Sequence, residues 1–260
     1  MKLLLIILAS GATGALFLLL HKSIRIHKKL FGIQEDIAGL KGLVRSDRLE
    51  QELSNVYAQL QAYLDLERLI SPAAPLPRLR GWAASPDFLL VLSQHVLGRR
   101  PDVILECSSG ASTVVLARCC QILGSGHVFS LEHAAEFAEK TRATLAAHGL
   151  TEWATVVDAP LRPAPEVDNR VWYSLENLPA QARECHMLVI DGPPAGSAEI
   201  ARYPALRMLA DRLSPGCEIF LDDYGRDDER QIVQRWLAET PGLKALPIET
   251  EKGCAHLRHE

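Results

Sequence analysis

The chain has 260 residues, 48% of them hydrophobic. This length has room for one α/β domain of ordinary size and an appendage. Its formal net charge of −4, and the lack of a basic tract beyond the N-terminal region, argue against nucleic acid as a partner. The six cysteines lack the spacing of a zinc site, so we expect them in a reduced core rather than in disulfides.

Residues 3–20 contain no charged side chain. As a helix that rises about 1.5 Å per residue, they would span about 27 Å, close to the ~30 Å hydrocarbon core of a bilayer. Lysine and arginine residues follow this segment, and that charge bias predicts a cytoplasmic location for the rest of the chain. The sequence therefore predicts a single-pass membrane anchor over residues 1–21, with residues 3–20 in the membrane.

A cleaved signal peptide is the alternative interpretation of this segment. Residues 3–8 would form its apolar region, and the small residues around Ala12 to Ala15 would form its cleavage site. The mature chain would then begin with residues 16–20 as an apolar end without a partner, which favours the anchor.

Residues 22–70 show the spacing of amphipathic helices. Apolar residues recur at intervals of three and four in two runs: Leu30, Ile33, Ile37, Leu40 and Val44, then Leu49, Leu53, Val56, Leu60 and Tyr63. Such a helical stalk either packs on its own domain or pairs with a second copy as a homodimer, and the sequence does not decide between the two. The proline-rich residues 71–77 end the helix and mark the start of a domain over residues 71–260.

In that domain, strand-like and helix-like segments alternate. A helix is expected after Ser85, where a proline occupies the first turn. Strands of nearly continuous hydrophobicity are predicted at 103–106, 127–132, 154–159, 186–192 and 218–223, with two further strand-like pieces around a turn near the C-terminus. Strands of this kind separated by helices predict a parallel sheet covered on both faces, an α/β Rossmann-like fold.

The first predicted strand leads into a candidate ligand-binding turn. Its apolar residues end at Glu106, four small residues follow over 107–110, and a helix opens at Ala111. Small side chains let a ligand approach the backbone amides at the start of a helix. A carboxylate at this place does not suit a pyrophosphate, which is itself negatively charged. It does suit a cofactor with hydroxyls and an ammonium group. The motif therefore favours S-adenosylmethionine (SAM) over a dinucleotide.

Most of the predicted strands end in acids, namely Glu106, Glu132, Asp158, Asp191, and Asp222 with Asp223. Ligands of open α/β sheets bind beyond the carboxyl ends of the strands, so these acids are expected at one edge. Their carboxylates accept hydrogen bonds and suit a ligand with hydroxyls or positive charge. Glu132 follows the turn by some twenty residues, a place where an acid can hold both ribose hydroxyls.

From Trp82 onward the chain resembles the class I SAM-dependent methyltransferases, in particular the small family often labelled methyltransferase domain 24. The matching segments are ILECSSGASTVVLA, VFSLEH, ATVVDAPL, LVIDGPP, ARYPALRMLADRLSPG, FLDD and ETEKG. The resemblance implies about seven strands in the order 3-2-1-4-5-7-6, with the last strand antiparallel. The family's turn carries glycine at alternating positions, and here Ser108 and Ser112 take two of those places.

The resemblance also implies roles for particular residues. Glu106 and the turn Ser108–Gly110 would face the methionine part of SAM, Glu132 would hold the ribose, and Asp158 with Ala159 would border the adenine. The residues expected around the cofactor are Glu106, Cys107, Ser108, Ser109, Gly110, Ser112, Thr113, Glu132, His133, Asp158, Ala159 and Asp191.

Asp191, Asp222 and Asp223 are the candidate catalytic residues. In the similar catechol-type O-methyltransferases, acids at these strand ends hold a divalent metal ion that acidifies the acceptor hydroxyl, and three carboxylates suit Mg²⁺. The alternative is that Asp191 begins a turn and that Asp222 or Asp223 caps the next helix. The expected function is SAM-dependent O-methylation of a small or membrane-associated acceptor.

Two other functions are weighed against this one. A nicotinamide-dependent oxidoreductase would need G-x-G-x-x-G, and the turn keeps only Gly110. A membrane-tethered binding module that keeps the fold without catalysis is the second alternative, which Ser108 and Ser112 suggest.

Overall fold

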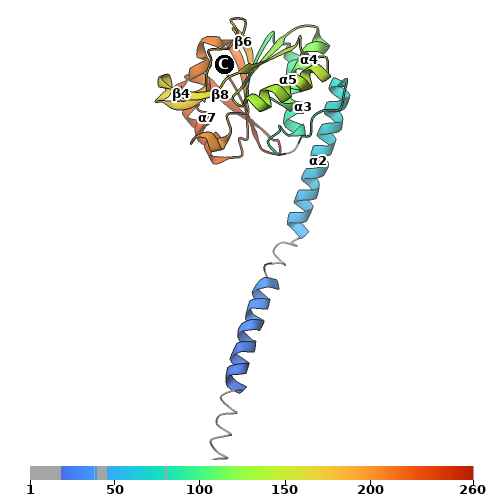
Figure 1. The fold of residues 1–260 in the computed structure, drawn as a ribbon, viewed down its shortest axis with the longest axis vertical. Helices are drawn as coiled ribbons and strands as arrows, with labels where there is room; N and C mark the ends of the chain where they lie inside the picture. Colours follow the sequence, from blue (N-terminus) through green and yellow to red (C-terminus); the bar gives the residue numbers. More distant parts are fainter. Residues whose placement is uncertain (1–18, 38, 40–45, 80, 260) are drawn as a thin grey trace, which may run out of the picture. The chain divides into compact units, whose positions relative to one another are not determined.

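The computed structural model describes residues 19–37, 39, 46–79 and 81–259. The chain divides into two compact units, Met1–Val56 and Tyr57–Glu260. In the first unit, residues 19–37 are helical, and the helix α2 (Ser46–Ile70) begins there and continues into the second unit. The second unit carries the sheet and its helices (Figure 1).

The prediction of a single-pass membrane protein with a cytoplasmic domain is wrong on the evidence of the described helices. None of them is long and apolar enough to cross a bilayer. The helix over 19–37 carries Lys22, Arg25, Lys28 and Lys29, charges that a bilayer core disfavours. Most of the predicted span, residues 3–18, and the alternative cleavage site near Ala15 lie outside the described residues.

The main sheet has seven strands in the order β3-β2-β1-β6-β7-β9-β8. Their bounds are β1 Val103–Cys107, β2 His127–Glu132, β3 Ala154–Asp158, β6 Cys185–Ile190, β7 Leu213–Asp222, β8 Leu243–Ile248 and β9 Cys254–His259. All neighbours pair in parallel except β9, which is antiparallel to β7 and β8. Counted within this sheet alone, the order is 3-2-1-4-5-7-6.

Between β3 and β6 the chain forms a separate two-stranded hairpin, β4 (Leu161–Ala164) and β5 (Arg170–Tyr173), which is not part of the main sheet. The sequence did not predict it, because its strands are short and Pro163 stands in the first. Its second strand ends with Trp172 and Tyr173, both buried in the core. The hairpin thereby brings an aromatic hydroxyl close to the carboxyl ends of the main strands.

Helices cover both faces of the sheet, as the nearly continuous hydrophobicity of the strands predicted. The helices α3 (Pro86–Arg99), α4 (Ala111–Leu123) and α5 (Ala135–Ala147) lie on one side in Figure 1, and α7 (Asp227–Glu239) lies on the other. The helix α6 (Ala205–Leu209) is short and packs into the same core as α7. Along β1, Ile104 belongs to the core under α3 to α5, while Leu105 belongs to the core under α6 and α7.

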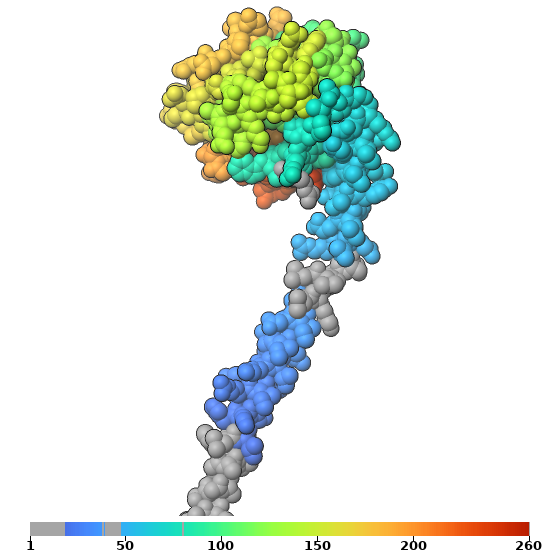
Figure 2. Space-filling model, turned by 45° about the vertical axis from the view of Figure 1, so that its right-hand side comes forward, coloured from blue at the N-terminus to red at the C-terminus, as the bar shows by residue number. Residues whose placement is uncertain are grey.

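The last turns of α2 belong with the domain. Leu66 and Ile70 are buried in the same core as α3 and α4, and the Arg118 guanidinium donates to the Ile70 carbonyl oxygen at 2.9 Å. In Figure 2 the C-terminal half of α2, in cyan, lies against the domain. The packed alternative for the stalk thus applies to the last turns of α2, whereas Leu49, Leu53 and Leu60, earlier in the helix, are exposed. Homodimerisation through α2 stays a prediction.

The six cysteines are all buried and free, as the sequence predicted for a reduced core.

Candidate active site

The carboxyl ends of β1, β2, β6 and β7 lie at one edge of the sheet because these strands are parallel neighbours in register. Cys107 pairs with Leu131 on one side and with Ile190 on the other. Ile190 in turn pairs with Leu221. The acids at the ends of these strands therefore meet at this edge, as the sequence predicted.

Glu106, at the end of β1, is completely buried. Its Oε2 accepts hydrogen bonds from Thr113 Oγ1 at 2.6 Å and from Ser130 Oγ. Its Oε1 is buried and has no hydrogen-bond partner among the described residues. Burial raises the pKa of this carboxyl above its ordinary value, and the hydroxyls around it, Ser112 included, oppose that shift. Glu106 thus offers one free acceptor atom to a ligand that donates.

The turn after β1 departs from the usual glycine pattern, and the backbone accommodates the change. Ser108 has φ 98°, in the region that favours glycine. A Cβ placed on Gly192 would lie 2.9 Å from Ser108 Cβ and 2.4 Å from Tyr173 Oη. The serine at 108 therefore fits because its neighbour across the turn is a glycine. Gly110 N donates to Thr113 Oγ1 at 3.0 Å, which fixes the start of α4.

Glu132, at the end of β2, holds this turn. Its Oε2 accepts from Ser109 N at 3.1 Å and from Ser109 Oγ at 3.0 Å, and its Oε1 accepts from Ala134 N at 3.0 Å. A carboxylate has about four lone-pair sites, so these bonds leave little capacity for further donors. The sequence predicted a ribose-binding role for Glu132 and missed its contact with the turn.

The residues expected around the adenine lie beside this turn. Ala159 is buried, and its N–H donates to the Glu132 carbonyl oxygen at 2.7 Å. Asp158 is exposed and pairs with Arg142 at 2.7 Å. The ring centroids of His133 and Tyr173 are 6.2 Å apart. Tyr173 comes from the hairpin that the sequence did not predict.

Asp191, Asp222 and Asp223 form a carboxylate cluster. One potential ligand atom from each of the three lies within 4.8 Å of the others. The alternative role as a helix cap does not apply, because α7 begins after Arg226 and has no side-chain capping bond. Asp191 N donates to the Cys107 carbonyl oxygen at 3.1 Å, which places this residue next to the turn.

A buried arginine, which the sequence analysis missed, lies on this cluster. Arg202 Nη2 donates to Asp223 Oδ2 at 2.7 Å and to Asp191 Oδ1 at 3.2 Å. Its Nη1 donates to the Asp222 carbonyl oxygen at 2.9 Å. No spacing rule marks Arg202 in the sequence, since it comes from a loop that contacts the acids only in the folded chain.

Burial raises the pKa of two carboxyl groups of the cluster, Asp191 and Asp222. Burial raises the pKa of Asp191 to about 6, with Arg202 opposing the shift. Burial, together with the charges of Asp191 and Asp223, raises the pKa of Asp222 to about 8. Both carboxyl oxygens of Asp222 are buried and find no hydrogen-bond partner in the described part of the chain.

These residues do not fit a resident Mg²⁺. Three carboxylates have suitable donor atoms, but Mg²⁺ requires ligand bonds of about 2.1 Å in near-octahedral geometry. The Arg202 guanidinium already uses one oxygen of Asp191 and one of Asp223. An arginine does not lose its proton in a protein, so it remains a positive charge beside the ion's place.

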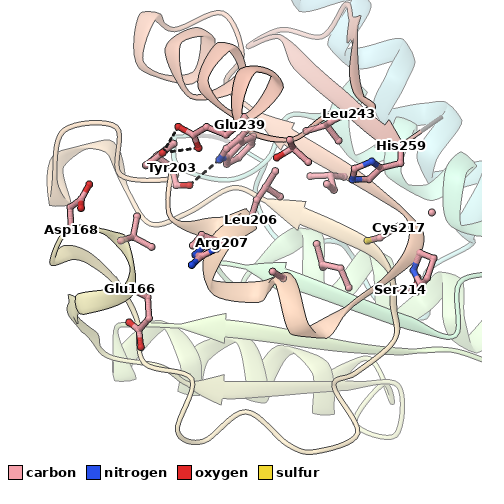
Figure 3. A pocket seen from close by; sticks show the side chains of 18 residues that line it. Glu166, Asp168, Tyr203, Leu206, Arg207, Ser214, Cys217, Glu239, Leu243 and His259 are labelled. Carbon is pink, nitrogen blue, oxygen red and sulfur yellow. Dashed lines mark hydrogen bonds between the residues drawn. The ribbon is translucent and has the colours of Figure 1, made fainter.

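A cavity of about 780 Å³ lies elsewhere, between α6, the end of α7 and the start of β7 (Figure 3). Tyr203 and Glu239, which line it, are hydrogen-bonded to each other, with Tyr203 Oη 2.7 Å from Glu239 Oε1. None of the acids that end the strands lines this cavity. We therefore place the candidate site at the acidic edge.

The chain is similar to known methyltransferases. Residues 105–224 match the family model of a methyltransferase domain. No curated protein matches the chain.

Solved structures, methyltransferases among them, share the fold, and three are given as examples. They are cofactor-bound Rv0187 from MTB, SAH-bound methyltransferase PaMTH1 from Podospora anserina, and the O-methyltransferase from Bacillus cereus in complex with SAH. In that order the identities are 23%, 15% and 20%, and the TM-scores 0.53, 0.56 and 0.52. The matches cover 79%, 83% and 80% of this chain and 89%, 97% and 97% of the other chains.

Proposed function

We propose that this chain, a SAM-dependent methyltransferase by its domain at residues 105–224, transfers the methyl group to an oxygen atom of a small acceptor. The observation that carries the proposal is the acidic edge, where a buried carboxylate with a free oxygen lies beside a turn of small residues. The similar structure from Bacillus cereus is an O-methyltransferase solved with SAH, the demethylated product of SAM.

The residues at this edge fit the groups of SAM. We assign Glu106 Oε1, the free acceptor, to the ammonium group of the methionine part, with the turn Ser108–Gly110 beside it. We assign Glu132 to the ribose, and His133, whose Nδ1 lies 3.0 Å from Glu132 Oε1, with Asp158 and Ala159 to the side of the adenine. SAM supplies a methyl group activated by a sulfonium, so the chain itself must orient the acceptor and take its proton.

Asp191 is the group that we assign to the acceptor hydroxyl. Its carboxylate is the most exposed of the cluster, with side-chain exposures of 12% for Asp191 and 4% for Asp223, and its backbone lies next to the turn. The acceptor oxygen forms a bond to the methyl carbon, the carbon–sulfur bond breaks, and the hydroxyl proton passes to Asp191. Arg202 holds Asp191 in place through a hydrogen bond to Oδ1, and Asp223 accepts from the same nitrogen of Arg202.

Turnover of SAM tests this function. The full chain is incubated with SAM and a set of small phenols and alcohols, and SAH is measured by mass spectrometry. We expect SAH and the methyl ether to form with at least one hydroxyl compound and not with the analogue whose hydroxyl is already methylated. Transfer to amines alone would contradict the assignment to oxygen.

A further inference from the structure

Arg202 is fixed on the carboxylate cluster by the main chain as well as by side chains. Its two terminal nitrogens donate to the carbonyl oxygens of Asp191 and Asp222, at 3.2 Å and 2.9 Å. These carbonyls belong to residues at the carboxyl ends of β6 and β7. The guanidinium thus joins the ends of two neighbouring strands, and its position does not depend on the carboxylates alone.

The charges around Arg202 are arranged for a cation at this point. Its side chain is 4% exposed, and Asp223 and Glu229 are similarly buried. Arg202 Nη2 lies 2.7 Å from Asp223 Oδ2, and Nε lies 3.7 Å from Glu229 Oε1. Arg226 adds a second positive charge at 2.8 Å from Asp223 Oδ2. Buried carboxylates repel one another unless a cation, a proton or donors compensate, and the two arginines supply such charge.

We propose that Arg202 is the resident cation of the carboxylate cluster and that it takes the place of a divalent metal ion in this enzyme. The inference rests on the methyl transfer proposed above. A guanidinium supplies a fixed positive charge and directed N–H donors, which hold Asp191 Oδ1 and leave the other oxygen of that carboxylate for the acceptor. Arg202 is therefore a positioning residue, which acts on the acceptor through Asp191.

Metal binding by the full chain tests the proposal without reference to catalysis. Mn²⁺ is titrated into the wild-type protein, and the free ion is followed by electron paramagnetic resonance. We expect no stoichiometric binding, and we expect SAH formation to be unchanged by EDTA. Binding of one Mn²⁺ per wild-type chain, or loss of SAH formation in EDTA with recovery in Mg²⁺, would overturn the proposal.

The variant Arg202→Ala opens the cluster. If this protein folds, we expect it to bind one Mn²⁺ per chain, and we expect Asp223→Asn in addition to weaken that binding at least tenfold. Arg207→Ala is the matched control, because this exposed arginine belongs to α6 and lies outside the cluster. Like the wild type, the Arg207→Ala protein should show no stoichiometric Mn²⁺ binding. A folded Arg202→Ala protein that binds no Mn²⁺ would contradict the role of Arg202.

The variant Arg202→Lys covers the case in which the alanine variant fails to fold. It keeps a positive charge and is expected to bind no Mn²⁺, whereas binding by this variant would contradict the charge argument. A wild-type chain that binds no metal and forms no SAH with any acceptor would refute the proposed methyl transfer and the positioning role with it, and would leave only Arg202 as the cation of the cluster.

Discussion

Replacement of Asp191 by asparagine is expected to lower kcat for methyl transfer by about 10²–10⁴-fold, the range for loss of a general base. Asparagine keeps an oxygen that can accept from Arg202 but cannot take the acceptor proton. The affinity for SAH should therefore change little. The measurement is kcat from initial rates of SAH formation, together with the SAH affinity of the same preparation.

The matched control for this variant is Asp223→Asn. Asp223 bonds to the same nitrogen of Arg202 but is buried and lies farther from the acceptor in our assignment. A smaller loss of kcat is expected there. Equal losses in the two variants would show that the cluster acts only as a structural unit.

The pH dependence of kcat reports the same group. Burial raises the pKa of Asp191 to about 6; Arg202 and Lys252 lower it, and Asp223 and Glu106 raise it. Because the carboxylate is the form that accepts a proton, kcat should rise as the pH increases through about 6 and should level off above. The rise should be absent in Asp191→Asn. A rise in that variant at the same pH would assign the titration to another group.

Replacement of Glu132 by alanine has the second large expected effect. The affinity for SAH should fall by about 1.5–3 kcal/mol, the scale of hydrogen bonds to a charged group, which is roughly a 10- to 150-fold weaker Kd. The loss has two sources, because the carboxylate is assigned to the ribose and also holds Ser109. We therefore expect a lower free energy of unfolding as well, by about 1–3 kcal/mol.

The two sources can be separated with Ser109→Ala. This variant loses the hydroxyl bond to Glu132 but keeps the backbone bond and the carboxylate. It should weaken SAH binding less than Glu132→Ala does. Glu136→Ala, an exposed acid in the first turn of α5, is the control for a lost charge and should bind like the wild type. An unchanged affinity in Glu132→Ala would contradict the ribose assignment.

The strands and the acidic edge could be predicted from the sequence because their signals are local. Each buried strand is a short apolar run, and the acid at its end directly follows that run, as in Val103 to Glu106. Parallel pairing then brings the ends of such strands together without any knowledge of side-chain contacts. The small residues between Glu106 and Ala111 likewise indicated a turn before a helix.

Contacts between distant residues could not be predicted in this way. Arg202 lies 11 residues from Asp191 and 21 from Asp223, and no periodic pattern connects them. The hairpin that supplies Tyr173 has strands of only four residues. The bond between Ser109 and Glu132 arises from the closeness of β1 and β2. The features that the sequence missed are therefore contacts between side chains that lie far apart along the chain.

The membrane prediction rested on the uncharged residues 3–20, and none of the described helices is long and apolar enough to cross a bilayer. The apolar segment ends near residue 20, and the described helix after it is charged along its length. For the helical stalk, the apolar spacing was equally consistent with packing on its own domain and with pairing with a second copy of the chain. Burial of Leu66 and Ile70 assigns the last turns of α2 to packing on the domain.

Binding of SAH to the full chain, measured by calorimetry with NADH as the comparison, is the most direct test of whether this protein is a SAM-dependent enzyme. We predict saturable binding of one SAH per chain and no heat of binding with NADH. Binding of NADH in place of SAH would indicate the oxidoreductase alternative. Binding of neither ligand would contradict a SAM-dependent enzyme and would favour a chain that keeps the fold without the cofactor.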